Sequence, residues 1–215
     1  MSAAELLSGP SGYGLEKDDL GCFYCDRCLD DRTPIRLTIG EGVRFRYFLH
    51  AAPVEENFQR VVEIDLTGPG ARVEVYGLVI GSANRSLSLS ISLRHSASDS
   101  HSLCRLNSIG ADRADLSLVG RVTVPRGALC CSSILCNKNL RLSPSTQLRT
   151  LPILDIAAPD ARCSHGTTVG GPNPQQLFYM RSRGLDQNCA RKLLCDAFAD
   201  EITRHFPVVY RLPLP

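Results

Sequence analysis

The chain has 215 residues, and its 24 lysines and arginines against 22 aspartates and glutamates leave a net charge of only +2, too balanced for a nucleic-acid surface. No apolar stretch approaches the roughly 20 residues of a membrane span, and the N-terminus lacks the basic and apolar regions of a secretory signal. We therefore expect a cytoplasmic protein that binds neither nucleic acid nor membrane. In a reducing compartment, ten cysteines favour metal or sulfur chemistry over disulfides.

Residues 1–33 lack hydrophobic periodicity and are expected to form an irregular N-terminal arm. The arm contains Cys22, Cys25 and Cys28, a spacing found in iron-sulfur and zinc sites. Neither a fourth cysteine nor a nearby histidine completes the set. The two interpretations are therefore a metal site and three incidental thiols.

Residues 34–170 alternate between apolar and polar side chains over many short segments, which is typical of strands with one buried face. Examples are Ile35–Ile39 and the serine-separated leucines of 86–93. Glycine and proline breaks separate the segments, and no Asn-Gly or Asp-Gly pair indicates a tight hairpin. The pattern predicts an all-β fold and favours a β-solenoid over a sandwich or barrel.

The last predicted strand places Cys163 two positions before His165. Residues i and i+2 of a strand point to the same side, so both side chains could address one site. A thiol with an imidazole suits iron, zinc or copper. The alternative is that Cys163 is a small buried core residue and His165 an ordinary turn residue.

Residues 171–206 change to a helical period. Asn173 is a suitable N-cap with Pro174 in the first helical position, and Gly184 is a suitable residue to end that helix. Asp186 is expected to cap a second helix with one apolar stripe. Residues 207–215 contain three prolines and are expected to form an extended tail.

Two runs, CSHGTTVG over 163–170 and LFYMRSRGL over 177–185, resemble the C-terminal signature of the SufB/SufD family, on the SufD side. These proteins are scaffold subunits of the SUF machinery for iron-sulfur cluster assembly. The resemblance extends over about residues 70–203 and is specific over about 137–198. It implies a right-handed parallel β-helix, or β-solenoid, as the core, followed by a C-terminal helical hairpin.

The resemblance also implies a function and partners. A SufD-like subunit would pair with a SufB-like subunit, each binding one SufC-like ATPase, and ATP hydrolysis would occur in SufC. His165, with Cys163, would hold iron or a transient iron-sulfur cluster at the subunit interface. Phe178, Tyr179, Arg181 and Arg183 lie in the helical segment that would contact SufC. The chain itself would be neither an enzyme nor a nucleotide-binding protein.

SufB-type members carry a cluster-building cysteine on the strand that corresponds to residues 137–143, and this position falls on Asn137. The neighbouring Cys136 would face the opposite side of the strand unless a bulge turned it inward. This departure favours a SufD-like role and leaves Cys136 as a possible alternative ligand.

Three other possibilities remain open. The chain could be a non-catalytic β-solenoid interaction module without cluster or metal. It could be a metalloenzyme that combines the Cys22, Cys25 and Cys28 set with His165. It could also form a homodimer, in which two His165 residues would meet across a two-fold axis.

Overall fold

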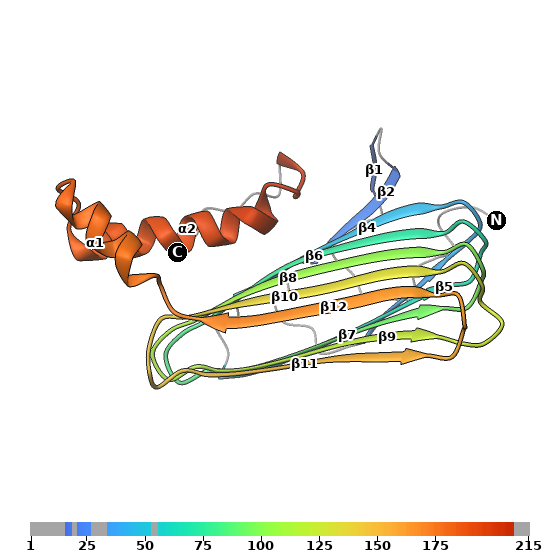
Figure 1. Ribbon diagram of the computed structural model, residues 1–215, viewed down its shortest axis with the longest axis horizontal. Coiled ribbons are helices and arrows are strands. Elements are labelled where there is room, and N and C mark those ends of the chain that lie inside the picture. Colours follow the sequence, from blue (N-terminus) through green and yellow to red (C-terminus); the bar gives the residue numbers. More distant parts are fainter. Residues whose placement is uncertain (1–15, 19–20, 27–33, 53–55, 209–215) are drawn as a thin grey trace.

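The computed structural model describes residues 16–18, 21–26, 34–52 and 56–208. They form two β-sheets that face each other across one interior, with two helices after the last strand (Figure 1). The strands are β1 (Glu16–Asp18), β2 (Gly21–Asp26), β3 (Ile35–Ile39), β4 (Arg44–Ala51), β5 (Asn57–Leu66), β6 (Arg72–Gly81), β7 (Ser86–His95), β8 (His101–Gly110), β9 (Asp115–Val124), β10 (Ser132–Arg141), β11 (Gln147–Ile156) and β12 (Arg162–Gly170). The helices are α1 (Pro174–Ser182) and α2 (Gln187–Thr203).

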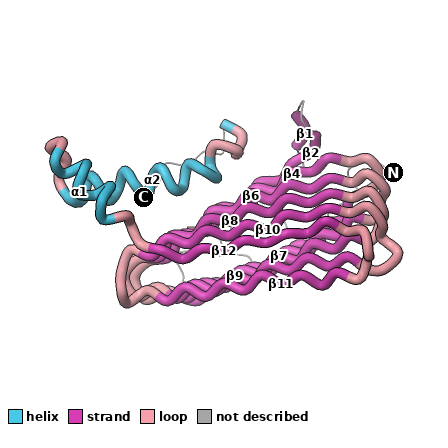
Figure 2. The backbone as a smooth tube through the Cα atoms, viewed as in Figure 1, coloured by secondary structure: helices cyan, strands magenta, loops and turns pink. Residues whose placement is uncertain are grey.

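From β2 onward the chain alternates between the two sheets, so each coil contributes one strand to each (Figure 2). One sheet has the order β1-β2-β4-β6-β8-β10-β12 and the other β11-β9-β7-β5-β3. All neighbours are parallel except β1 and β2. The predicted β-solenoid with a C-terminal pair of helices is therefore confirmed.

The interior of the solenoid is filled by the alternate side chains of both sheets. Its buried members are mainly Val, Leu and Ile, with Phe45 and Tyr47 at the N-terminal end. Polar side chains in the interior form ladders between coils: Ser102 bonds Ser133 at 2.7 Å and Ser108 donates to Asn139 at 2.6 Å. Each pair is 31 residues apart, the length of one coil at this point.

Glycines make room in the interior for large side chains from the opposite sheet. A Cβ on Gly120 of β9 would lie 2.8 Å from a methyl carbon of Leu135 on β10. The absence of a side chain at Gly120 therefore allows Leu135 to fill the space between the sheets.

A second apolar cluster lies on the outer face of the seven-stranded sheet, beneath α2. Ala199, Ile202 and the following Phe206 are buried against sheet residues that include Phe48 and Leu78. Asn107 of β8 donates to the backbone carbonyl of Phe198 at 2.8 Å. The second half of α2 is therefore fixed to the sheet, whereas α1 has no buried residue.

The two ends of the solenoid differ. At the N-terminal end of the seven-stranded sheet, β1 folds back on β2 as an antiparallel strand, and Gly21 takes the turn with a φ of +122°. At the C-terminal end, β12 and β11 are the last strands of their sheets. The interior side chains of this last coil are therefore less covered, and Val169 on the interior face of β12 is 50% exposed.

The first strands of the fold contradict the prediction of an irregular N-terminal arm. Residues 1–33 were predicted to be irregular, whereas Gly21–Asp26 forms strand β2 and Glu16–Asp18 forms β1. The pattern was missed because β2 buries side chains on both faces and so shows no simple alternation. Within the described part of the chain, neither helix has the length and apolar character needed to cross a membrane.

Candidate functional site at the open end of the solenoid

Strand β12 is the edge strand that carries the predicted thiol-imidazole pair. It pairs with β10 in continuous parallel register, so that Ser133 lies beside Cys163, Leu135 beside His165 and Asn137 beside Thr167. Leu135 belongs to the interior core, and Cys163 packs against the same core. Because strand side chains alternate, Cys163, His165 and Thr167 all lie on the interior face of the last coil.

Cys163 and His165 differ in exposure. Cys163 is half-buried, and burial raises the pKa of its thiol, while a hydrogen bond to the Ser133 backbone acts in the opposite direction. His165 is exposed at the open end. The histidine is thus available to an incoming metal ion or subunit, whereas the thiol keeps its proton until a metal or base removes it.

Cys136 does not join this pair. It lies beside Gly166 in an unbroken register, with no bulge on either side. Its side chain therefore points to the outer face of the sheet, opposite the interior face of Leu135 and Asn137. The structure separates Cys136 from His165 by the thickness of the sheet.

Asn137 lies on the interior face of β10, at the position where the resemblance to SufB-type proteins implies a cysteine. Its Nδ2 donates to Oγ1 of Thr150, on β11 of the opposite sheet, at 2.6 Å. Its Oδ1 is buried without a hydrogen-bond partner among the described residues, as is Oγ1 of Thr167. Sequence reasoning missed Thr167, although its place two residues after His165 on the same strand face was a usable signal.

The N-terminal cysteines are not brought together as one site. Cys22 belongs to the interior core, and Cys25 belongs to the cluster on the outer face of the same sheet. Cys28 lies outside the described residues. Across the residues that the structure places, no three His, Cys, Asp or Glu side chains form a metal-binding group.

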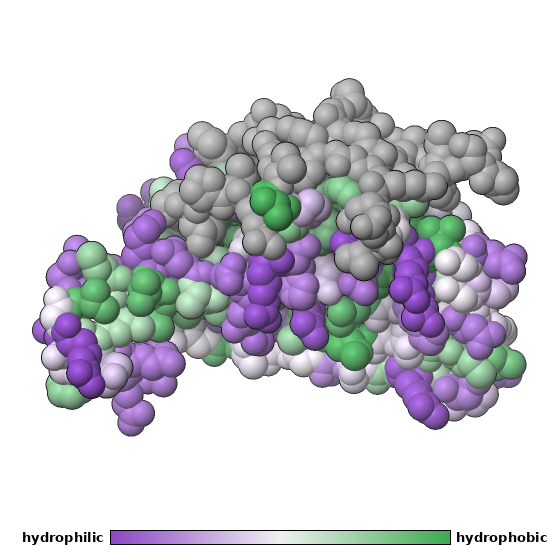
Figure 3. Space-filling view, turned by 90° about the horizontal axis from the view of Figure 1, so that it is seen from above, coloured by the Kyte–Doolittle hydropathy of each residue, from purple (hydrophilic) through white to green (hydrophobic). Residues whose placement is uncertain are grey.

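The helical pair presents an exposed apolar surface. Phe178 and Tyr179 of α1 are 74% and 59% exposed, and Leu193 of α2 is also exposed. The Arg183 guanidinium lies 5.4 Å from the centre of the Tyr179 ring, a cation–π contact, and Arg181 is exposed on the last turn. Figure 3 shows apolar side chains gathered at the left end, over this helical pair.

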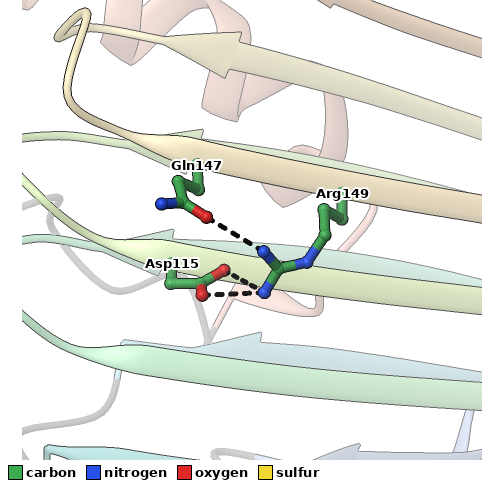
Figure 4. Close-up of polar contacts among 3 residues, drawn as sticks. All are labelled: Asp115, Gln147 and Arg149. Atoms are coloured by element: carbon green, nitrogen blue, oxygen red, sulfur yellow. Dashed lines mark hydrogen bonds and ion pairs between the residues drawn. The ribbon is translucent and has the colours of Figure 1, made fainter.

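A shallow pocket of about 280 Å³ lies on the outer face of the five-stranded sheet. Its charged members already pair with each other: Arg149 bonds both carboxylate oxygens of Asp115, at 2.6 and 2.7 Å, and Oε1 of Gln147 at 3.0 Å (Figure 4). Serine, asparagine and glutamine side chains form most of the remaining lining. With its cation neutralised, this pocket has no feature that selects a ligand.

Comparisons with known proteins identify one family for most of the chain. Residues 54–198 match the family described as SUF system FeS cluster assembly, SufBD core domain. An iron-sulfur cluster assembly SufBD family protein of Synechocystis is 37% identical over 133 residues, which cover 57% of this chain and 29% of that protein. The iron-sulfur cluster assembly protein SufD of Escherichia coli is 30% identical over 138 residues, 64% of this chain and 33% of that protein.

The chain thus spans about a third of the length of these curated relatives. The matched segment nevertheless contains most of the solenoid, including β12, together with α1 and most of α2. The chain belongs to the SufBD core domain family of the SUF system for iron-sulfur cluster assembly.

Proposed function

We propose that this chain is a SufD-like scaffold subunit, on which an iron-sulfur cluster is assembled at an interface with a second, SufB-like subunit. The observation that carries the proposal is the position of His165. It lies exposed on the interior face of the edge strand, at the open end of the solenoid, with Cys163 on the same face. A histidine in that position is half of a site that another subunit can complete.

The open end has the properties of an interface. Strand β12 leaves one edge without a neighbour among the described strands, and such an edge can pair with a strand of another chain. Exposed Val169 on the interior face of β12, and exposed Leu151 on the outer face of β11, would add apolar contact there. The same end could take a second copy of this chain, which would bring two His165 side chains together.

Iron is the cargo of the proposed reaction. The imidazole of His165 binds Fe(II), a metal of intermediate softness, less tightly than a thiolate does and so can release it. Cys163 would supply a second ligand from the same strand once its proton has left. The missing thiolate would come from the partner, because this chain has Asn137 rather than cysteine on the interior face of β10.

The helical pair is proposed to dock a SufC-like ATPase. An aromatic pair that is more than half exposed, with two arginines beside it, has the composition of an interface hot spot. Because α2 packs firmly on the seven-stranded sheet, a movement of the docked ATPase would also displace the sheet. No nucleotide need bind to this chain for that coupling.

Co-expression tests the scaffold role. The chain should co-purify with a SufB-like and a SufC-like protein, and anaerobic addition of iron and sulfide should then give the visible absorption of a cluster. His165→Ala should abolish that absorption and leave the complex intact. Ser164→Ala is the matched control, because Ser164 lies on the outer face of the same strand. Failure to form any complex would contradict the scaffold role.

The reconstitution also distinguishes a plain interaction module. If the three proteins associate but His165→Ala leaves the cluster spectrum unchanged, the chain is a binding platform and His165 is not a ligand. If the chain forms a complex with SufC alone and elutes as a dimer that assembles a cluster, the partner at the open end is a second copy.

A further inference from the structure

Two buried oxygen atoms at the open end have no hydrogen-bond partner among the described residues. Oδ1 of Asn137 belongs to a residue that is only 5% exposed, and Oγ1 of Thr167 belongs to its neighbour in register on β12. A buried polar atom without a partner destabilises the fold, so two of them on residues paired in register require a reason.

Asn139, a second asparagine on the same strand, differs from Asn137 in its hydrogen bonds. Asn139 follows two residues later on the same interior face, and it is satisfied at both ends. Its Oδ1 accepts from Ser108 at 2.6 Å, and its Nδ2 donates to the backbone carbonyl of Thr168 at 2.9 Å. The coil therefore satisfies one asparagine completely and leaves the one nearer His165 half satisfied.

The orientation of the Asn137 amide follows from its other bond. Nδ2 donates to Thr150 Oγ1 at 2.6 Å, which leaves the acceptor Oδ1 for another group. A carbonyl acceptor next to a hydroxyl suits a small group with an O–H to donate. The simplest such group is a water molecule.

The position of these two oxygens connects them with iron. Thr167 lies two residues from His165 on the same strand face, and Asn137 is its direct neighbour on β10. Iron held by one imidazole and one or two thiols still has coordination positions for water. Water bound to a metal ion is a stronger hydrogen-bond donor than free water, and groups that accept its protons fix its orientation.

We propose that Asn137 and Thr167 are positioning residues that hold an iron-bound water at the open end. Oδ1 of Asn137 accepts one of its protons, and Thr167 accepts the other. This inference rests on the proposed function, because it takes His165 as the residue that holds the iron. It assigns to this chain a second group of residues that retain the cargo without touching the metal.

The experiment uses the complex with the SufB-like and SufC-like proteins under anaerobic conditions. Fe(II) affinity is measured by competition with a chelator, and the absorption of Co(II) in the same site reports the coordination number, because six-coordinate Co(II) absorbs far more weakly than four-coordinate Co(II). Thr167→Val replaces only the hydroxyl with a methyl group and preserves the strand. Asn137→Leu removes both amide groups.

Loss of a group that orients a metal ligand typically lowers affinity about 10- to 100-fold. We expect Thr167→Val to weaken Fe(II) binding within that range and to strengthen the Co(II) absorption, as a water is lost. Thr168→Val is the matched control, because the neighbouring Thr168 faces outward, and it should bind like the unchanged chain. Asn137→Leu should act in the same direction; if it fails to fold, Thr167→Val still decides the question.

The outcomes separate the two proposals. If His165→Ala abolishes iron binding while Thr167→Val has the unchanged affinity and Co(II) spectrum, the positioning role is wrong and the proposed function stands. A rise in thermal stability of Thr167→Val with unchanged iron binding would also overturn the inference, since the hydroxyl would then be only an unsatisfied group. If His165→Ala binds iron normally, the proposed function itself fails.

Discussion

Asn137 on β10 donates a hydrogen bond of 2.6 Å to Thr150 on β11, across the interior of the last coil. This bond joins the two sheets where the solenoid has no further coil to cover it. We predict that Thr150→Val, which keeps the shape but removes the acceptor, lowers the free energy of unfolding by about 1–3 kcal/mol. Urea unfolding measures the change. Thr123→Val, on the outer face of β9, is the control and should change stability by less than about 0.5 kcal/mol.

A second prediction concerns the glycine opposite Leu135. Gly120→Ala would place a Cβ 2.8 Å from a Leu135 methyl carbon, so the Leu135 side chain must shift from its place in the interior. Overpacking of this kind costs about 1–3 kcal/mol. Because Leu135 lies beside His165, the variant should also weaken cluster formation in the complex. Gly127→Ala, where a Cβ meets nothing within 4 Å, should leave both measurements unchanged.

A third prediction concerns pH. His95 is completely buried, and Ser100 and Ser102 bond its two ring nitrogens at 2.8 and 2.9 Å. Burial lowers the pKa of His95 to about 4 from 6.5. Between these values the unfolded chain binds a proton that the folded chain does not, so stability decreases as the pH falls from 6.5 towards 4.

The free energy of unfolding should fall by about 3 kcal/mol over that interval, at 1.36 kcal/mol for each pKa unit. His95→Gln should be less stable than the unchanged chain at pH 7 but should show a smaller decrease between pH 7 and pH 4.5. Urea unfolding at several pH values gives the change in the free energy of unfolding with pH for each protein. The carboxylates contribute equally to both, so the difference between the two proteins reports His95. Equal slopes would show that His95 is not the group responsible.

A fourth prediction tests the attachment of α2. Phe206 is buried against the sheet, and its ring centre lies 5.2 Å from that of Phe48. Phe206→Ala should lower the free energy of unfolding by about 3–5 kcal/mol, because it removes a buried aromatic ring. It should also increase amide hydrogen exchange in the second half of α2. Val208→Ala, at an exposed position, should have no such effect. Unchanged exchange in Phe206→Ala would mean that the remaining contacts suffice to hold the helix.

The surface of α1 provides a fifth prediction. If α1 docks a SufC-like ATPase as proposed, Phe178→Ala and Tyr179→Ala should each weaken that binding by at least tenfold. Neither variant should lose thermal stability, because neither side chain is buried in this chain. Gln176→Ala, also exposed on α1, is the control. Isothermal titration with the ATPase measures the affinity, and a normal affinity in both variants would exclude this face.

The sequence was sufficient for the strand pattern of residues 34–170 and for the helix ends, but not for strands β1 and β2. Asn173 and Asp186 both cap their helices through side-chain hydrogen bonds, as their residue types predict. Simple alternation predicted that Cys163 and His165 share one face of their strand, and the pairing with β10 shows that this face is the interior one. The sequence could not show that Cys22 and Cys25 belong to opposite faces of β2, because that strand is apolar on both sides. Nor could it show the unpaired oxygens of Asn137 and Thr167, which depend on the opposite sheet.

The short connection between β12 and α1 has a mechanical consequence. Gly170 ends the strand and Pro174 begins the helix, so a load applied to α1 passes almost directly into the backbone of β12. A pull along the strand would strain all its hydrogen bonds to β10 together, in shear. A pull away from the sheet would open them one after another from Gly170, and Thr167 would be freed before His165. The direction of a force from a bound ATPase would therefore decide whether β12 stays paired with β10 or separates from it one hydrogen bond at a time.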